Sequence, residues 1–267
     1  MSDHFAYIEA VAVATPGIPD WDAAKTQLQH HGEIDTSDKT IPKAACLSSR
    51  EKRRASDTVN LSLHLAQTSC DLSDIDPKDC RSVFLSSDGD ADIFHELASN
   101  LAESEPAISP TLFHQSLHNS ASGYWHIATG SQMPSTALSI AEHTFSAGLL
   151  SSLIEVQATQ IPSLVAAYDL PSPKPMDAKN PTKIWFGVSF ILTPLKTAKS
   201  LAKLTVEICE DHPITVINSD ALKTLAIQNT IARCLPLLDR LASSTSGDVI
   251  LDYLSPSVLK LNVEIVQ

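Results

Sequence analysis

Short apolar runs alternate with longer segments of mixed polarity along most of the chain. The apolar runs, rich in small and β-branched residues, predict strands at residues 6–15, 81–87, 136–141, 163–167, 185–193, 204–209 and 258–266. The longer segments have the length and apolar content of helices, which we expect at residues 53–69, 91–103, 116–129, 144–158 and 220–243. Strands that alternate with helices in this order predict an α/β architecture on a mostly parallel, buried sheet.

Polar and Pro-rich stretches separate these elements. Residues 18–42 are polar and contain turn-forming residues, so we expect a surface excursion there, and the Asp- and Ser-rich residues 71–79 predict a loop. A Pro-rich linker spans residues 170–181. Beyond it, the strands expected at 185–193 and 204–209 flank a Lys-rich turn, which predicts that they pair with each other in antiparallel orientation.

The overall composition is that of a globular chain. Its 267 residues are 43% hydrophobic, with a mean hydropathy of +0.01. No apolar run reaches the roughly 18 residues of a membrane-spanning helix, and the N-terminal residues lack the features of a secretory signal, so we expect a cytoplasmic protein without a membrane span. The formal net charge of -12 disfavours nucleic acid as a partner, because phosphate binding requires a basic face.

Residues that commonly bind metals or attack substrates are not arranged for either task. The five cysteines are scattered, odd in number and form no C-x-x-C pair, which argues against a disulfide framework and against a zinc site. His114 and His118 have the i, i+4 spacing of a helical ligand pair, but no acidic ligand accompanies them. No G-x-S-x-G motif supports a serine hydrolase. We therefore expect no metal and no cofactor.

Residues 108–147 carry the most informative pattern in the chain. Its landmarks, in order, are Ser109-Pro110, Asn119, Gly123, Ile127 and Met133-Pro134-Ser135. They resemble the stretch of elongating ketoacyl synthases that leads to the nucleophilic cysteine, and no gap is needed between Pro110 and Glu142 to place them. In that register Glu142 stands at the cysteine position.

The resemblance to ketoacyl synthases covers most of residues 6–209, whereas no landmark of that family is found from Glu210 onward. It implies a ketoacyl synthase-like N-terminal domain over residues 1–209. It also implies a short C-terminal extension over residues 210–267, a helix and a strand packed on the same domain. The implied fold is the α/β, thiolase-like fold, mainly its N-terminal half in α-β-α layers, with the second half reduced.

The resemblance also bears on catalysis. In ketoacyl synthases the cysteine lies at a strand-to-helix turn, where the helix N-terminus lowers its pKa and gives the thiolate that accepts the acyl chain. Two histidines from the second half of the fold assist decarboxylation and stabilise the oxyanion. A carboxylate is a poor acyl acceptor, and after Glu210 the only histidine is His212, in a context unlike either motif. The resemblance thus implies that this chain alone is not a condensing enzyme.

A ketosynthase-like chain without its cysteine resembles the chain-length factors of type II polyketide systems, and most of all the short, acid-substituted members associated with aryl polyene biosynthesis. This implies a heterodimer with a cysteine-containing ketoacyl synthase that acyl carrier proteins supply. The residues implied near the partner's acyl tunnel are Leu112, Phe113, His114, Leu117 and His118. Those implied at the dimer interface, around the strand before residue 142, are Asn119, Trp125, Thr136, Leu138, Ile140 and Phe145.

Three other interpretations stay open at this point. Glu142 can be an ordinary solvated acid at a helix cap. It can also be the nucleophile or general base of an independent acyl-carrier-protein decarboxylase or hydrolase. Finally, the chain can be a scaffold that docks carrier proteins without contacting a tunnel.

Overall fold

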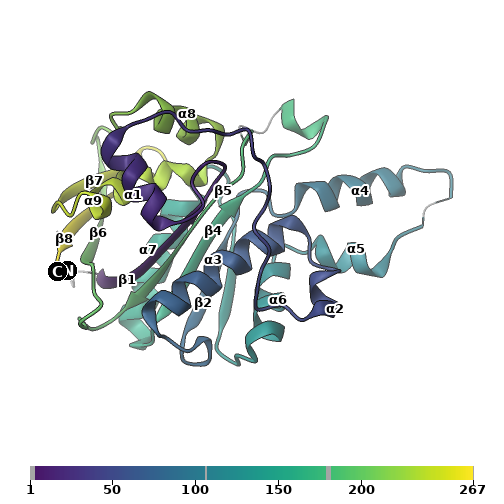
Figure 1. The fold of residues 1–267 in the computed structure, drawn as a ribbon, viewed down its shortest axis with the longest axis horizontal. Coiled ribbons are helices and arrows are strands. Elements are labelled where there is room, and N and C mark those ends of the chain that lie inside the picture. Colours follow the sequence, from purple (N-terminus) through teal and green to yellow (C-terminus); the bar gives the residue numbers. More distant parts are fainter. Residues whose placement is uncertain (1–3, 106, 179–181, 267) are drawn as a thin grey trace.

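A computed structural model describes residues 4–105, 107–178 and 182–266 of the chain. These residues form one sheet of eight strands in the order β3-β2-β4-β5-β1-β6-β8-β7, with helices on both faces (Figure 1). The strands are β1 (His4–Ala14), β2 (Arg81–Leu85), β3 (Ser135–Leu138), β4 (Ser163–Asp169), β5 (Phe186–Thr193), β6 (Ala202–Glu210), β7 (Gly247–Asp252) and β8 (Ser257–Ile265).

The sheet is mixed rather than mostly parallel. β2 runs parallel to its neighbours β3 and β4, whereas the other neighbouring strands are antiparallel. The expected pairing of residues 185–193 with 204–209 is wrong, because β1 lies between β5 and β6 and pairs with both. Most side chains of β1 are apolar and buried, so this strand is suited to the centre of a sheet that is covered on both faces.

The α-helices are α1 (Trp21–His30), α2 (Ser49–Lys52), α3 (Asp57–Ser73), α4 (Ala91–Leu101), α5 (Pro110–Gln115), α6 (Ser120–Thr129), α7 (Thr144–Thr159), α8 (Asp220–Gln228) and α9 (Leu235–Ala242). Three 3-10 helices accompany them: η1 (Pro77–Asp79), η2 (Met176–Ala178) and η3 (Ile231–Cys234). Within the described residues, no helix combines the length and the apolar character needed to cross a membrane.

Several predicted elements have different bounds in the structure. The helix expected over 220–243 is divided into α8, η3 and α9, because the extended backbone of Asn229 ends α8. The surface excursion expected over 18–42 contains α1, and the loop expected over 71–79 contains the end of α3 and η1. The strand expected as buried over 136–141 is β3, which is shorter and only half-buried because it forms the edge of the sheet. β7 was not expected.

The helices enclose a separate hydrophobic core on each face of the sheet. Val11 of β1 belongs to the core that includes side chains of α7 and α9, whereas the neighbouring Ala10 belongs to the core that includes those of α3 and α6. Gly148 lets α7 lie directly on β2, since a Cβ atom there would be 2.3 Å from a methyl carbon of Leu85. This close packing fixes the N-terminal end of α7 against the sheet.

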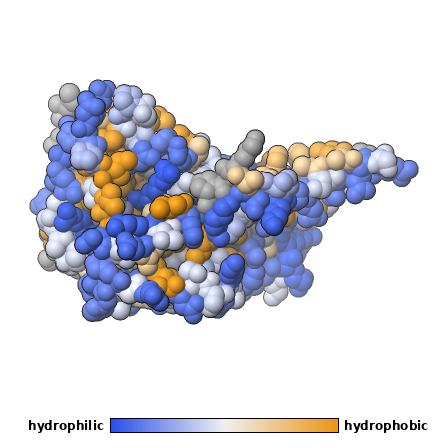
Figure 2. Space-filling view, turned by 90° about the horizontal axis from the view of Figure 1, so that it is seen from above, coloured by the Kyte–Doolittle hydropathy of each residue, from blue (hydrophilic) through white to orange (hydrophobic). Residues whose placement is uncertain are grey.

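Two helices extend beyond the body of the molecule. Figure 1 shows α4 and α5 projecting from the end of the sheet opposite to β7 and β8. We call residues 90–105 and 107–117, which contain both helices, the arm. In Figure 2 a hydrophobic band follows the arm at the right of the view. Because β3 is the edge strand at the end opposite to β7, the arm and β3 belong to the same end of the sheet.

Candidate functional site

Glu142 lies in a tight turn between β3 and α7. β3 ends at Leu138 and α7 begins at Thr144, so residue 142 is at the expected junction of strand and helix. Thr144 Oγ1 accepts a hydrogen bond from the Ile140 N–H at 2.8 Å and donates one to the Ala141 C=O at 2.7 Å, which closes the turn. Ala141 has a φ of 44°, in the left-handed region that costs a non-glycine residue about 1 kcal/mol. The turn thus holds Glu142 beside the helix N-terminus at some cost in backbone strain.

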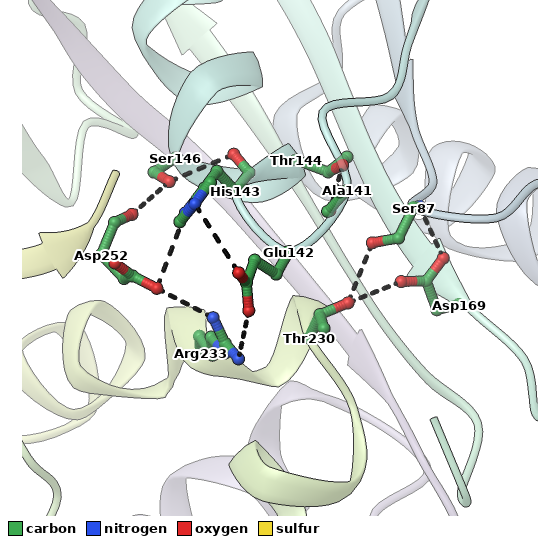
Figure 3. A network of polar contacts seen from close by, with 10 residues as sticks. All are labelled: Ser87, Ala141, Glu142, His143, Thr144, Ser146, Asp169, Thr230, Arg233 and Asp252. Atoms are coloured by element: carbon green, nitrogen blue, oxygen red, sulfur yellow. Dashed lines mark hydrogen bonds and ion pairs between the residues drawn. The ribbon is translucent and has the colours of Figure 1, made fainter. Parts of the chain in front are cut away.

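Side chains from the C-terminal part of the chain hold Glu142 (Figure 3). Arg233 Nη2 lies 3.3 Å from Glu142 Oε2, while Arg233 Nη1 lies 2.9 Å from Asp252 Oδ2. The ring of His143 lies between the same carboxylates, 3.9 Å from Glu142 Oε1 and 3.6 Å from Asp252 Oδ2. Ser146 Oγ donates a hydrogen bond to the Asp252 C=O at 2.5 Å. These contacts join the turn and α7 to η3 and to the end of β7.

The ion pairs of this network are partly exposed to solvent. The exposed fraction is 56% for the Glu142 side chain, 35% for Arg233 and 29% for Asp252. Water and salt screen charges at such exposure, so we expect the pair of Glu142 and Arg233 to stabilise the fold by about 1 kcal/mol or less. Its clearer effect is on position, because the two terminal nitrogens of the Arg233 guanidinium bind one carboxylate each, that of Glu142 and that of Asp252.

The cysteines of the chain are not activated thiols. Burial raises the pKa of the Cys70 thiol to about 12, and it also raises the pKa values of Cys80 and Cys234. Desolvation raises the pKa values of Cys46 and Cys209 as well. All five therefore stay neutral thiols near pH 7, whereas a cysteine acts as a nucleophile in its thiolate form.

An apolar groove of about 540 Å³ opens beside Glu142. Residues 214–217 line one part of it, and α8 and the first turn of α9 contribute Ala226, Ile227, Leu235 and Pro236. Its volume is within the range of small-molecule sites. The charged groups among its lining residues are already paired, because Arg233 contacts Glu142 and Asp252, and Lys223 contacts Asp220. An apolar group can lie in the groove, but an acid entering it must compete with Glu142 for Arg233.

A second polar cluster lies beside the turn, around a buried carboxylate (Figure 3). Asp169, at the end of β4, accepts hydrogen bonds from Ser86 Oγ at 2.9 Å, from the Ser87 N–H at 2.8 Å and from Thr230 Oγ1 at 3.0 Å. Burial raises the pKa of Asp169 to about 6, although these hydrogen bonds act to lower it. Thr230 directly precedes η3, so the cluster connects the ends of β2 and β4 to the segment that carries Arg233.

The sequence alone did not identify these partners. Arg233 is a lone cation within an apolar stretch, and Asp169 is a lone acid at the end of an apolar strand. Both are signals of a buried or half-buried polar contact. Neither pattern says which distant residue completes the contact, and Asp252 belongs to a strand that was not expected.

The residues expected near a partner's tunnel all lie on α5 or in the turn that follows it. Phe113 and Leu117 are 57% and 43% exposed, and His114 is exposed too, with its ring edge-on to Tyr124 at 6.3 Å. Leu112 and His118 are half-buried. None of them lines the groove beside Glu142. Within this chain they therefore form part of an outer surface.

The residues expected at a dimer interface do not share one environment. Asn119 is exposed and Ile140 is half-buried. Thr136 and Leu138 are half-buried on the edge strand β3.

Trp125 and Phe145 correct the prediction, because they are 1% and 4% exposed and are core residues of this chain. The ring of Phe145 packs against Phe190 at 6.2 Å. Large aromatic side chains fill the space between helix and sheet, so neither offers surface to a partner.

Comparison with known families and structures shows which proteins the chain resembles. The family model described as beta-ketoacyl synthase, N-terminal domain, matches residues 21–240. The match extends beyond Glu210, although the sequence from that residue onward contains no recognisable landmark of the family. No curated protein matches the chain.

Solved structures share the fold at low sequence identity. The complex of the ketosynthase ApeO with its chain length factor ApeC from Xenorhabdus doucetiae matches with a TM-score of 0.72 and 18% identity, over 96% of this chain and 98% of that chain. The ishigamide ketosynthase/chain length factor matches with a TM-score of 0.74 and 11% identity, over 98% and 99%. AntDE:AntF, a type II polyketide synthase acyl carrier protein in complex with its ketosynthase, matches with a TM-score of 0.73, 11% identity and the same coverage. The expected α/β, thiolase-like fold is thereby confirmed.

Proposed function

Because the chain belongs to the family of β-ketoacyl synthase N-terminal domains, we propose that it is a non-catalytic chain-length factor that pairs with a cysteine-bearing synthase subunit in the cytoplasm. One observation carries the proposal. A strand-to-helix turn lies where the resemblance predicts it, and residue 142 in it is a glutamate that is ion-paired to Arg233. The turn keeps a geometry suited to a nucleophile and lacks the sulfur that the chemistry requires.

The chemistry of the carboxylate supports a non-catalytic role. A ketosynthase carries its growing chain as a thioester, and an ion-paired carboxylate is a weak nucleophile towards such an ester. The negative charge of Glu142 also repels the carboxylate of a malonyl extender. The raised pKa values of all five cysteines leave no alternative thiolate in the chain.

The edge strand β3 supports the proposed pairing with a synthase. The Ser82 N–H donates to the Pro134 C=O and the Ser86 N–H donates to the Leu138 C=O, so these carbonyls face β2. The polar backbone groups of successive residues in a strand point to opposite sides. The N–H and C=O of Ala137 therefore point away from β2, where a strand of the partner can pair with them.

The tunnel-shaping role is proposed for the residues on and after α5. Phe113 and Leu117 are exposed in the single chain, so a partner that covers β3 can also enclose them. Bulk at Leu112 or Phe113 would then limit how far an acyl chain extends, at about 0.8 kcal/mol per buried methylene. We propose a polyketide or aryl polyene chain as the product, delivered by acyl carrier proteins to the synthase subunit. We also propose that residues 210–267 are an extension of one domain formed by residues 1–209, which the continuous sheet supports.

Coexpression with a cysteine-bearing synthase and size-exclusion chromatography test the pairing. Wild type should elute with the synthase as a heterodimer. Ala137→Pro should abolish it, because proline removes the outward N–H without removing a hydrogen bond to β2. Ala137→Thr is the matched control, since it keeps the N–H and suits a strand. A wild-type chain that elutes as a monomer beside a fully active synthase would reject the function.

Product analysis of the same complex tests the tunnel. Phe113→Ala and Leu112→Ala should shift the products towards longer chains, because each removes bulk at the proposed tunnel. Ile127→Ala, an exposed apolar residue of α6, is the control and should leave the length unchanged. Identical product lengths in all variants would reject the tunnel assignment while leaving the pairing intact. That result would favour a scaffold that docks carrier proteins.

The groove beside Glu142 favours one alternative function, that of an independent acyl-carrier-protein decarboxylase or hydrolase. The purified chain would then turn over malonyl carrier protein, and Glu142→Gln would abolish the turnover. We expect none, because the carboxylate is engaged by Arg233.

A further inference from the structure

Helix α4 carries an apolar face that this chain covers only in part. Phe94, Leu97 and Leu101 are spaced three and four residues apart and so lie on one side of the helix. Leu97 is 7% exposed, whereas Phe94 and Leu101 on either side of it are 58% and 55% exposed. The apolar face is therefore wider than the surface that the chain packs against it.

The same kind of surface continues beyond α4. Ile108 before α5, Phe113 within it and Leu117 after it are 43%, 57% and 43% exposed. Figure 2 shows the hydrophobic band that results along the arm. Single exposed apolar residues are ordinary, but a group of five on one projecting element marks an interaction site. An 11-residue helix is also too short to be stable in water through its own hydrogen bonds, so α4 gains from being covered.

The charges of the arm restrict what can cover it. The arm contains five carboxylates and no lysine or arginine. Asp92, Glu96 and Glu103 are exposed on the arm. An anionic membrane surface would be repelled by these acids. The arm instead fits a protein surface that has an apolar centre and a basic rim.

The position of the arm indicates which partner protein covers it. Along the chain, α5 leads into α6 and α6 leads into β3, the edge strand, whose outer side pairs with no other strand among the described residues. Arm and edge strand lie at the same end of the sheet (Figure 1). A partner that extends the sheet at β3 therefore comes to lie beside the arm.

We propose that the arm is a second contact with the synthase subunit, in which Phe94 and Leu101 bind an apolar groove with a basic rim on the synthase. This inference rests on the proposed function and adds residues that neither the motif nor the edge strand identified. The arm contributes affinity through buried apolar area, while β3 sets the register of the two sheets. The two contacts are separable by mutation, since α4 is not part of the sheet.

The test measures binding of the purified full-length chain to an immobilised synthase subunit. Phe94→Gln and Leu101→Gln should each raise the Kd about tenfold, and the double variant about a hundredfold, because each removes a half-exposed apolar side chain from the contact. Ser99→Gln is the matched control, because it places the same new residue at an exposed, uncharged position on the opposite face of α4, and its Kd should stay within about threefold of wild type. Circular dichroism should be unchanged in all variants, because the three side chains are exposed.

The outcomes separate the inference from the proposed function. If wild type binds the synthase and the double variant binds equally well, the arm contact is wrong and the pairing through β3 stands. If wild type does not bind, the proposed function fails first. If the chain alone is a dimer that the double variant converts to a monomer, the arm binds a second copy and the inference is overturned. Rising salt should raise the wild-type Kd, as a basic rim requires, and an unchanged Kd would reject that rim.

Discussion

Asp169→Asn tests whether the buried cluster around this residue holds an ionised or a protonated acid. The ordinary pKa of an aspartate is 3.8, and burial raises the pKa of Asp169 to about 6. One pH unit corresponds to 1.36 kcal/mol, so the ionised carboxylate destabilises the folded chain by about 3 kcal/mol. The asparagine is close in shape. Its amide oxygen can accept from Ser86 and Ser87, and its amide nitrogen can donate to Thr230, whose hydroxyl can then donate to Ser87 Oγ at 2.9 Å.

The direction of the pH dependence follows from proton binding. The folded chain binds the proton of Asp169 more tightly than the unfolded chain does, so ionisation favours unfolding. The destabilisation is absent below about pH 4, grows as the pH rises and is complete above about pH 7. About half of the total of about 3 kcal/mol falls between pH 5 and pH 8. Asp169→Asn lacks this contribution at every pH.

The measurement is urea unfolding of wild type and Asp169→Asn at several values between pH 5 and pH 8. The stability of the variant relative to wild type should increase by about 1.5 kcal/mol over that range. Taking the difference cancels the other titrating groups. Asp79→Asn, at an exposed position, is the control and should show a constant difference. A difference between wild type and Asp169→Asn that does not change with pH would refute the raised pKa.

Further predictions concern the turn, its arginine and the packing of α7. Arg233→Met should lower the free energy of unfolding by about 1 kcal/mol, because it leaves two carboxylates without their cation, and an unchanged urea midpoint would contradict this. Gly148→Ala should destabilise the chain by about 2 kcal/mol, because the added methyl group meets Leu85. Gly123→Ala has open space around it and should stabilise α6 by about 1 kcal/mol. Equal melting temperatures of the two variants would refute the packing argument. Ala141→Gly should raise the free energy of unfolding by up to about 1 kcal/mol by relieving the positive φ, and a loss of stability in urea would show that no strain is stored there.

The sequence predicts the elements of this fold better than their arrangement. The apolar strands and the helix caps are local signals, and Asp90, for example, caps α4 by accepting from the Ile93 N–H. Strand pairing is not local. β1 separates β5 from β6 although the turn between these strands looks like that of a hairpin, because the pairing depends on which strand buries both faces. The helix expected over 220–243 also depends on its context, since Asn229 uses its side chain to bind the Asp169 and Ile184 carbonyls.

In the candidate site, too, the sequence predicts local features but not the contacts between distant residues. The position of Glu142 follows from the register of a motif, which is a property of neighbouring residues. Its partners Arg233 and Asp252 come from elements about a hundred residues further along the chain, and no spacing rule connects them. Trp125 and Phe145 show the opposite error. The resemblance places them at an interface around the strand before residue 142, but large aromatic side chains also fill a core, and only the packing decides between the two.

The turn at Glu142 combines backbone strain with a side chain that is already ion-paired. Ala141 still adopts a positive φ, a strain that is expected where a side chain must be held in one direction. The side chain so held is an acid, and it is bound by a guanidinium from η3 that lines the same groove. Because η3 is also joined to the buried cluster through Thr230, the C-terminal part of the chain is connected to the turn at two points. The geometry of the turn is thus maintained by ion pairs and hydrogen bonds within the chain, which is the arrangement we expect if the chain is the proposed subunit that supports a reaction in its partner.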